Sequence, residues 1–246
     1  MAIWEQWGVP LAVLGLIVAT LFMSAIVKRY QTQQALIRAR IQRISVGIST
    51  IEQSLETLRG VPLSRELRLT LRGDVLARYQ QIARLYRRYP DIAQRLQVAE
   101  QAMQAEGGSV ASGVGPIADS QQFNQIMRAI DALHDLVSES QTVQPIPNDV
   151  RGIFCRELGE RRAEANARYH LTRSQHHAED GDEPRARAHI TTLMQVLKKR
   201  GPATGFVREL YAEAEQALNG AGTANRKKAG EAEGNAQETD ADRESA

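Results

Sequence analysis

The sequence predicts an all-α protein: a single N-terminal transmembrane helix, then a helical bundle or helical-hairpin array, then a disordered C-terminal tail. Three observations support this fold class. Only 5% of the 246 residues are aromatic, and Ala, Leu, Arg, Glu and Gln, which favour helices, dominate after the first 27 positions. A long uncharged run lies near the N-terminus. Apolar residues then recur every three or four positions, which is the helical period.

The uncharged run covers residues 9–27 and reads VPLAVLGLIVATLFMSAIV. At about 1.5 Å per residue, a helix of this length spans roughly 28 Å, close to the thickness of the hydrocarbon core of a bilayer. Trp4 and Trp7 precede the run, at the place where indole rings favour the membrane interface. We therefore expect residues 9–27 to cross a membrane.

The charges on either side of this run predict its orientation. Residues 1–8 contain Glu5 and no Lys or Arg, whereas Lys28 and Arg29 follow the run directly. The positive-inside rule then places residues 1–8 outside, as a short external N-terminus, and the bulk of the chain in the cytoplasm. We expect an uncleaved, single-pass signal-anchor, in the inner membrane if the cell is bacterial. The one cysteine excludes an intrachain disulfide framework.

Residues 28–106 form a basic helical segment, with 14 Lys and Arg against 7 Asp and Glu, a net charge of +7. Within it, residues 31–59 have apolar side chains alternately four and three positions apart, as in a coiled coil. We call this set the Ile seam, and it consists of Ile37, Ile41, Ile44, Ile48, Ile51, Leu55 and Leu58. Two interpretations stay open: the seam joins copies of the chain into a homo-oligomer, or it packs against the next helix of the same chain.

Glycine, proline and capping residues predict where the next helices begin and end. Residues 59–62, Arg-Gly-Val-Pro, predict a turn with Gly60 in the left-handed conformation. Ser64 predicts the N-cap of a helix that continues to residue 89, because Pro90 cannot continue it. A shorter helix is expected over residues 92–103, where apolar positions recur at the same spacing.

The rest of the chain divides by composition into three parts. Residues 107–118 are rich in Gly and Ser, which predicts a flexible linker. Residues 119–219 contain four apolar stripes of helical period and are expected to form a helical domain, with Gly181 ending its longest helix. Residues 220–246 contain almost no large apolar side chain, so they are expected to be a disordered tail.

No catalytic motif is recognisable. The glycines near residue 110 lack the spacing of a phosphate-binding loop, and no nucleophile elbow is present. We therefore expect no enzyme activity, no catalytic residue and no cofactor. His170, His176 and His177 lie near Asp180, and residues four apart on a helix can share a metal ion. The alternative is an ordinary solvated helix end, so we assign no metal site, and metal binding there stays an open question.

An anchor joined to amphipathic helices, without catalytic residues, predicts a membrane-anchored helical scaffold or adaptor that acts through protein–protein interaction. The expected partners are the lipid bilayer, contacted by Trp4, Trp7, Lys28 and Arg29, and a protein that the sequence does not identify. The alternative is a membrane-tethered nucleic-acid-binding protein that uses the basic 28–106 segment. The net charge of that segment keeps this alternative open, although no recognition motif accompanies it.

Overall fold

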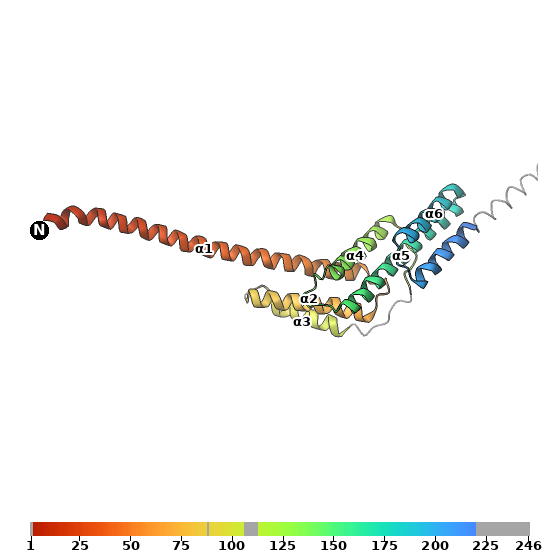
Figure 1. Ribbon diagram of the computed structural model, residues 1–246, viewed down its shortest axis with the longest axis horizontal. Helices are drawn as coiled ribbons and strands as arrows, with labels where there is room; N and C mark the ends of the chain where they lie inside the picture. The colour runs from red at the N-terminus through yellow and green to blue at the C-terminus, as the bar shows by residue number, and fades with distance from the viewer. Residues whose placement is uncertain (1, 88, 106–112, 220–246) are drawn as a thin grey trace, which may run out of the picture.

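The computed structural model describes residues 2–87, 89–105 and 113–219, without the side chains of residues 2–15 and 17–19. These residues form helices and no strand, so the predicted all-α class is confirmed (Figure 1). The helices are α1 (Ala2–Thr57), α2 (Arg65–Leu85), α3 (Ile92–Gln104), α4 (Ser120–Ser138), α5 (Asn148–Glu179) and α6 (Glu183–Arg200). A last helical stretch covers residues 205–219.

The first helix is continuous over 56 residues, so the predicted membrane segment and the Ile seam lie on one rod. Figure 1 shows the N-terminal part of α1 extending away from the other helices, while its C-terminal part lies among them. That C-terminal part packs against α2 and α4. The short turn at residues 58–64 reverses the chain, and α2 therefore returns along the apolar face of α1.

Within the part of the chain that the structure describes, no helix is both long and apolar enough to cross a membrane. The transmembrane prediction is therefore unsupported by the structure. Much of the predicted span at residues 9–27 lies outside the described side chains, namely residues 9–15 and 17–19. The predicted tail at residues 220–246 also lies outside the described residues.

The main core lies where α1, α2, α4 and the first half of α5 meet. The seam contributes Ile48 and Ile51, which are buried, and α2 contributes Leu67 and Leu71, which are completely buried. Burying one such side chain contributes about 1.5–3 kcal/mol to the hydrophobic free energy of folding. The alternating spacing of the seam therefore reflects packing inside one chain over this stretch.

The main core continues through the second part of the predicted linker. Val114 and Ile117 are buried in it, and the backbone N–H of Val114 donates to Oε1 of Glu164 at 3.0 Å. Within residues 113–118 of the predicted linker, Val114 and Ile117 are thus packed, whereas Gly115, Pro116 and Ala118 are exposed, and residues 107–112 lie outside the described residues. The main core includes side chains from residues 28–106 and from residues 119–219. These two parts of the chain therefore share one core.

A second, smaller core joins the C-terminal half of α5 to α6 and the last helical stretch, with Leu171, Leu193 and Leu210 among its buried residues. Gly181 ends this half of α5 with a φ of +79°, as predicted. The left-handed conformation predicted for Gly60 is wrong, because Gly181 is the one described glycine with a positive φ.

The second helix also ends earlier than predicted. Tyr86 adopts an extended conformation, and α2 therefore stops at Leu85, four residues before the predicted end at residue 89. The turn that follows leads into α3, where Asp91 has a φ of +56°. This turn, residues 86–91, is exposed at most of its described positions.

Candidate interaction groove

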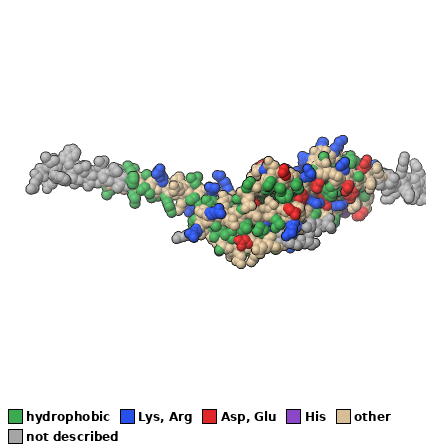
Figure 2. Space-filling view, turned by 60° about the horizontal axis from the view of Figure 1, so that its bottom comes forward, with side chains coloured by type: hydrophobic (Ala, Val, Ile, Leu, Met, Phe, Trp, Pro, Cys, Tyr) green, Lys and Arg blue, Asp and Glu red, His purple; other side chains and the backbone are tan. Residues whose placement is uncertain are grey.

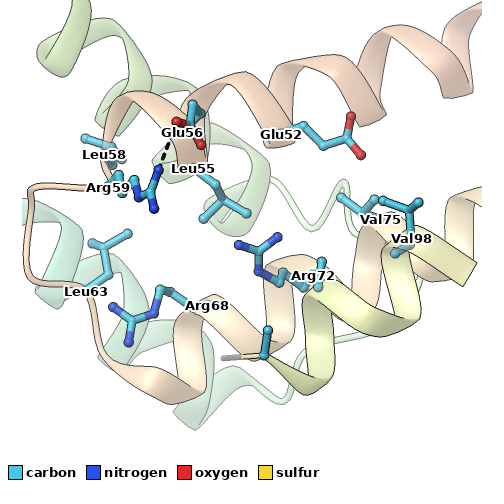
Figure 3. A pocket seen from close by; sticks show the side chains of 13 residues that line it. Glu52, Leu55, Glu56, Leu58, Arg59, Leu63, Arg68, Arg72, Val75 and Val98 are labelled. Atoms are coloured by element: carbon cyan, nitrogen blue, oxygen red, sulfur yellow. Dashed lines mark ion pairs between the residues drawn. The ribbon is translucent and has the colours of Figure 1, made fainter. Parts of the chain in front are cut away.

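A groove of about 810 Å³ opens between α1, α2 and α3, and we call it the α1–α3 groove. Figure 3 shows side chains from all three helices and from the turn after α1 converging on it. Its apolar lining comprises Leu55, Leu58, Leu63, Val75, Val98, Ala99, Ala102 and Ala105. Val98 on α3 is 56% exposed and lies at the open side of this lining.

Charged side chains surround this apolar lining. Glu52 and Glu56 come from α1, Arg59 from the turn, and Arg68 and Arg72 from α2. Figure 3 shows Arg72 pointing into the space between α1 and α2, and Arg68 extending toward the turn near Leu63. Arg59 Nη1 lies 3.7 Å from Glu56 Oε1, and both side chains are well exposed, so this pair stabilises the fold little.

One end of the groove is held by Ser64. Its backbone N–H donates to Oε1 of Glu157, and its hydroxyl donates to Oε2 of the same carboxylate at 2.7 Å. The Ser64 hydroxyl also accepts a hydrogen bond from the backbone N–H of Leu67, which confirms the predicted N-cap. The start of α2 is therefore fixed to α5, and Leu63, next to Ser64, is held in its place in the groove.

A smaller hollow of about 370 Å³ adjoins the groove and shares Glu52, Val98 and Ala99 with it. Within this hollow the Tyr79 hydroxyl donates to Oε1 of Glu52 at 3.4 Å. Burial raises the pKa of Tyr79, and the negative charge of Glu52 raises it further. The phenol therefore stays protonated at neutral pH and acts as a hydrogen-bond donor to α1.

The Ile seam does not form a single exposed surface. Ile44, Ile48, Ile51 and Leu58 are buried in the main core, whereas Ile41 and Leu55 are partly buried against it. At the N-terminal end of the seam, Ile37 is 39% exposed. Leu55 and Leu58 also line the α1–α3 groove, and Ile37 and Ile41 line a separate shallow groove beside the α2–α3 turn.

The predicted membrane-surface residues lie on α1. Lys28 and Arg29 are exposed, on the part of α1 that extends from the body. The side chains of Trp4 and Trp7 lie outside the described ones, so their predicted place at the membrane interface stays a prediction.

Three histidines, His170, His177 and His189, lie together at the interface of α5 and α6. The Nδ1 atoms of His170 and His189 are 3.1 Å apart, and the His177 ring stacks on that of His189. Burial, with a smaller effect of His189, lowers the pKa of His170 to about 4. His176 Nδ1 lies 3.5 Å from Asp180 Oδ2 at the exposed end of α5. Among the described residues, no group of three or more His, Cys, Asp or Glu side chains is arranged to hold a metal ion.

Cys155 is half-buried on α5. Burial raises the pKa of its thiol, so the thiolate that would act as a nucleophile is disfavoured at neutral pH. The arrangement around Cys155 therefore suits packing better than covalent chemistry.

Sequence reasoning missed the α3 side of the groove. Ile92, Leu96 and Ala99 mark the stripe of α3 that faces the body, and Val98 lies off this stripe. Single exposed apolar side chains are common on helices, so Val98 by itself gave no signal of this surface in the sequence.

Comparisons of the chain with protein-family models, with curated proteins and with solved structures find no match. The fold defines the class of the described part of the protein as all-helical.

Proposed function

We propose that this protein is a membrane-anchored helical scaffold or adaptor that binds a partner protein in the α1–α3 groove. The observation that carries the proposal is the combination of an apolar lining with a charged rim in an open groove of about 810 Å³. One wall of that groove is the same continuous helix that carries the predicted anchor at residues 9–27. A molecule bound there would be held at a set distance from the membrane.

The groove has the character of a site for an amphipathic helix. Helix-in-groove recognition needs an apolar floor for the buried face of the guest helix and polar groups at the edges. Leu55 and Val75 supply such a floor, and exposed Val98 extends it to solvent. Arginines and glutamates at the rim match a partner that carries both signs of charge rather than one strongly charged surface.

The proposed activity is binding rather than catalysis. The raised pKa of Cys155 disfavours a thiolate, and the hydroxyl of Ser64 is engaged with Glu157 and with the N-terminus of α2. Both side chains thus have structural roles where the fold places them.

The anchor and its orientation are part of the proposal and have a direct test. A reporter that is active only in the cytoplasm, fused after Leu218, should be active in cells, and alkaline carbonate should not release the chain from membranes. Activity of an exported reporter alone at the same site would contradict the cytoplasmic placement.

The partner site is tested by photo-crosslinking in native membranes. A benzoylphenylalanine placed at Val98 of the full chain should crosslink to a discrete protein. The matched control is the same group at Ile153, which is 59% exposed on α5 and outside the groove. Adding Ala102→Trp, which fills the groove, should abolish the adduct from position 98 without reducing helical content. Equal crosslinking from both positions would contradict the assignment.

The same membrane preparation distinguishes a protein partner from the alternative, a nucleic-acid partner. Nucleic acid that co-purifies at low salt and is lost at high salt would favour it, because phosphate contacts release counterions and weaken steeply with salt. Figure 2 shows Lys and Arg side chains in several separate groups on the face in view, with Asp and Glu between some of them. This distribution favours a protein partner over a continuous track for a phosphate backbone.

A further inference from the structure

The turn between α2 and α3 lies at one end of the helical body. Figure 1 shows this turn as the part of the body that points along α1 toward its N-terminus. Tyr86, Tyr89 and Pro90 of the turn line a shallow groove of about 510 Å³ together with α1 residues between Gln34 and Ser45. Tyr86 is 46% exposed, and Arg87 beside it is exposed as well.

The continuous α1 helix sets the distance between this turn and the predicted membrane segment. From the end of that segment at residue 27 to Gln34 the helix rises about 10 Å. The headgroup layer of a bilayer extends about 5–8 Å beyond the hydrocarbon core on each side. With residues 9–27 in the bilayer, as proposed, the turn would lie just outside the headgroups, within the Debye length of about 8 Å at physiological salt.

The charges on this end of the body are mostly positive, and the exposed carboxylate of Asp91, at the last position of the turn, is the exception. Residues 28–51 contain Lys28, Arg29, Arg38, Arg40 and Arg43, and no Asp or Glu. Residues 75–90, which return along this stretch, also contain no Asp or Glu, and Arg84 and Arg87 are exposed there. Carboxylates begin only at Glu52 on α1, at the end of the body where the α1–α3 groove lies.

Exposed arginines together with tyrosines are the side chains that favour the interface of an anionic membrane. We propose that the α2–α3 turn, with Arg38 of α1 and Arg84 of α2 beside it, is a second membrane contact that binds the anionic headgroup surface. The proposal rests on the proposed anchoring of residues 9–27. The contact holds the body against the bilayer and directs the α1–α3 groove, at the other end of α2, toward the cytoplasm.

The test measures depth with the full chain in nanodiscs of phosphatidylcholine, with or without phosphatidylserine. Cys155→Ala removes the native thiol, and a nitroxide is attached through Tyr86→Cys or, as a control, through Ile153→Cys. A nickel-chelating lipid at headgroup level should enhance relaxation of the nitroxide at position 86 severalfold more than at position 153. Phosphatidylserine should increase this difference, and Arg84→Glu with Arg87→Glu should remove the increase.

Failure of the proposed anchor and failure of the proposed turn contact give different results. If the chain does not incorporate into the discs, the proposed anchor is wrong and this contact is wrong with it. If the chain incorporates and the two nitroxides relax equally with phosphatidylserine present, the contact alone is overturned. Strong relaxation at position 86 that is indifferent to phosphatidylserine and to both glutamate substitutions would also overturn recognition of anionic lipid. Circular dichroism of each labelled variant checks that the helices are retained.

Discussion

The Oδ1 atom of Asp74 accepts a hydrogen bond from the backbone N–H of Val143 at 2.5 Å, although 69 positions separate the two residues. Its Oδ2 atom binds Nε of Arg78 at 2.6 Å, and Nη2 of Arg78 donates to the carbonyl oxygen of Gln141 at 2.7 Å. Asp74 is 3% exposed. One buried carboxylate therefore fastens α2, and with it the lining of the α1–α3 groove, to the connection between α4 and α5.

Asp74→Ala should destabilise the fold by about 3–5 kcal/mol, because it leaves the Arg78 guanidinium, a largely buried cation, without its carboxylate. The backbone N–H of Val143 also loses its acceptor. Denaturant unfolding followed by circular dichroism measures the loss. Asp135→Ala on α4 is the matched control: the Asp135 side chain is 68% exposed, so its removal should change the stability by less than about 0.5 kcal/mol. Equal effects of the two substitutions would contradict the structural role of Asp74.

The seam residue Ile51 is fully buried, and Ile51→Ala should cost about 2–5 kcal/mol, from lost apolar burial and the cavity left behind. Val46→Ala on the same helix removes a side chain that is 57% exposed and should cost much less. Thermal unfolding measures the melting temperature of each variant, and light scattering measures its mass in detergent. A change from oligomer to monomer with an unchanged melting temperature would instead indicate that the seam joins subunits.

Gly201 follows α6 where the chain turns toward the last helical stretch. A Cβ atom added there would lie 2.5 Å from the carbonyl oxygen of Leu197 and 2.8 Å from Cγ1 of Val207. Since a backbone carbonyl cannot move aside freely, Gly201→Ala should destabilise the second core by about 1–3 kcal/mol. Gly205→Ala is the control, because nothing lies within 4 Å of its added Cβ. Amide hydrogen exchange should show faster exchange in α6 for the first variant and not for the second.

The His170–His189 contact predicts a dependence of stability on pH. Burial lowers the pKa of His170 from 6.5 to about 4, so between these values the unfolded chain binds more protons than the folded chain. Its contribution to stability is therefore fully present above pH 6.5 and is lost as the pH falls toward about 4. Burial is also the main cause that lowers the pKa of His189, and the nearby positive charges of His177 and Arg173 lower it further.

Denaturant unfolding at a series of pH values tests this dependence. His170→Gln should make the free energy of unfolding less dependent on pH over that interval. His134→Gln on α4, away from the pair, should leave the dependence as it is in the unchanged chain. An identical slope for the unchanged chain and for His170→Gln would contradict the role of the pair.

Local patterns in the sequence predicted the elements of this fold well. The apolar stripes, the Ser64 cap and the Gly181 stop depend on neighbours within a turn or two of helix. The structure has α3 close to its expected range, whereas α2 ends four residues early and α1 is continuous over 56 residues. The candidate sites were less accessible. The lining of the α1–α3 groove comes from three helices, and no local pattern indicates which exposed apolar residue, such as Val98, will face another helix.

By itself, the sequence determined that the chain is helical, where most of its helices begin and end, and which face of each helix is apolar. The tertiary structure decided what those faces meet. The Ile seam has the same spacing whether it pairs with a second copy or with helices of its own chain. The tertiary structure buries most of the seam against α2 and α4 of the same chain. Composition indicated a linker at residues 107–118, yet Glu164, 50 positions away from Val114, supplies the acceptor for the backbone N–H of buried Val114. Helix formation is a local property of the chain, whereas partners for buried faces and buried polar groups exist only once distant segments have come together.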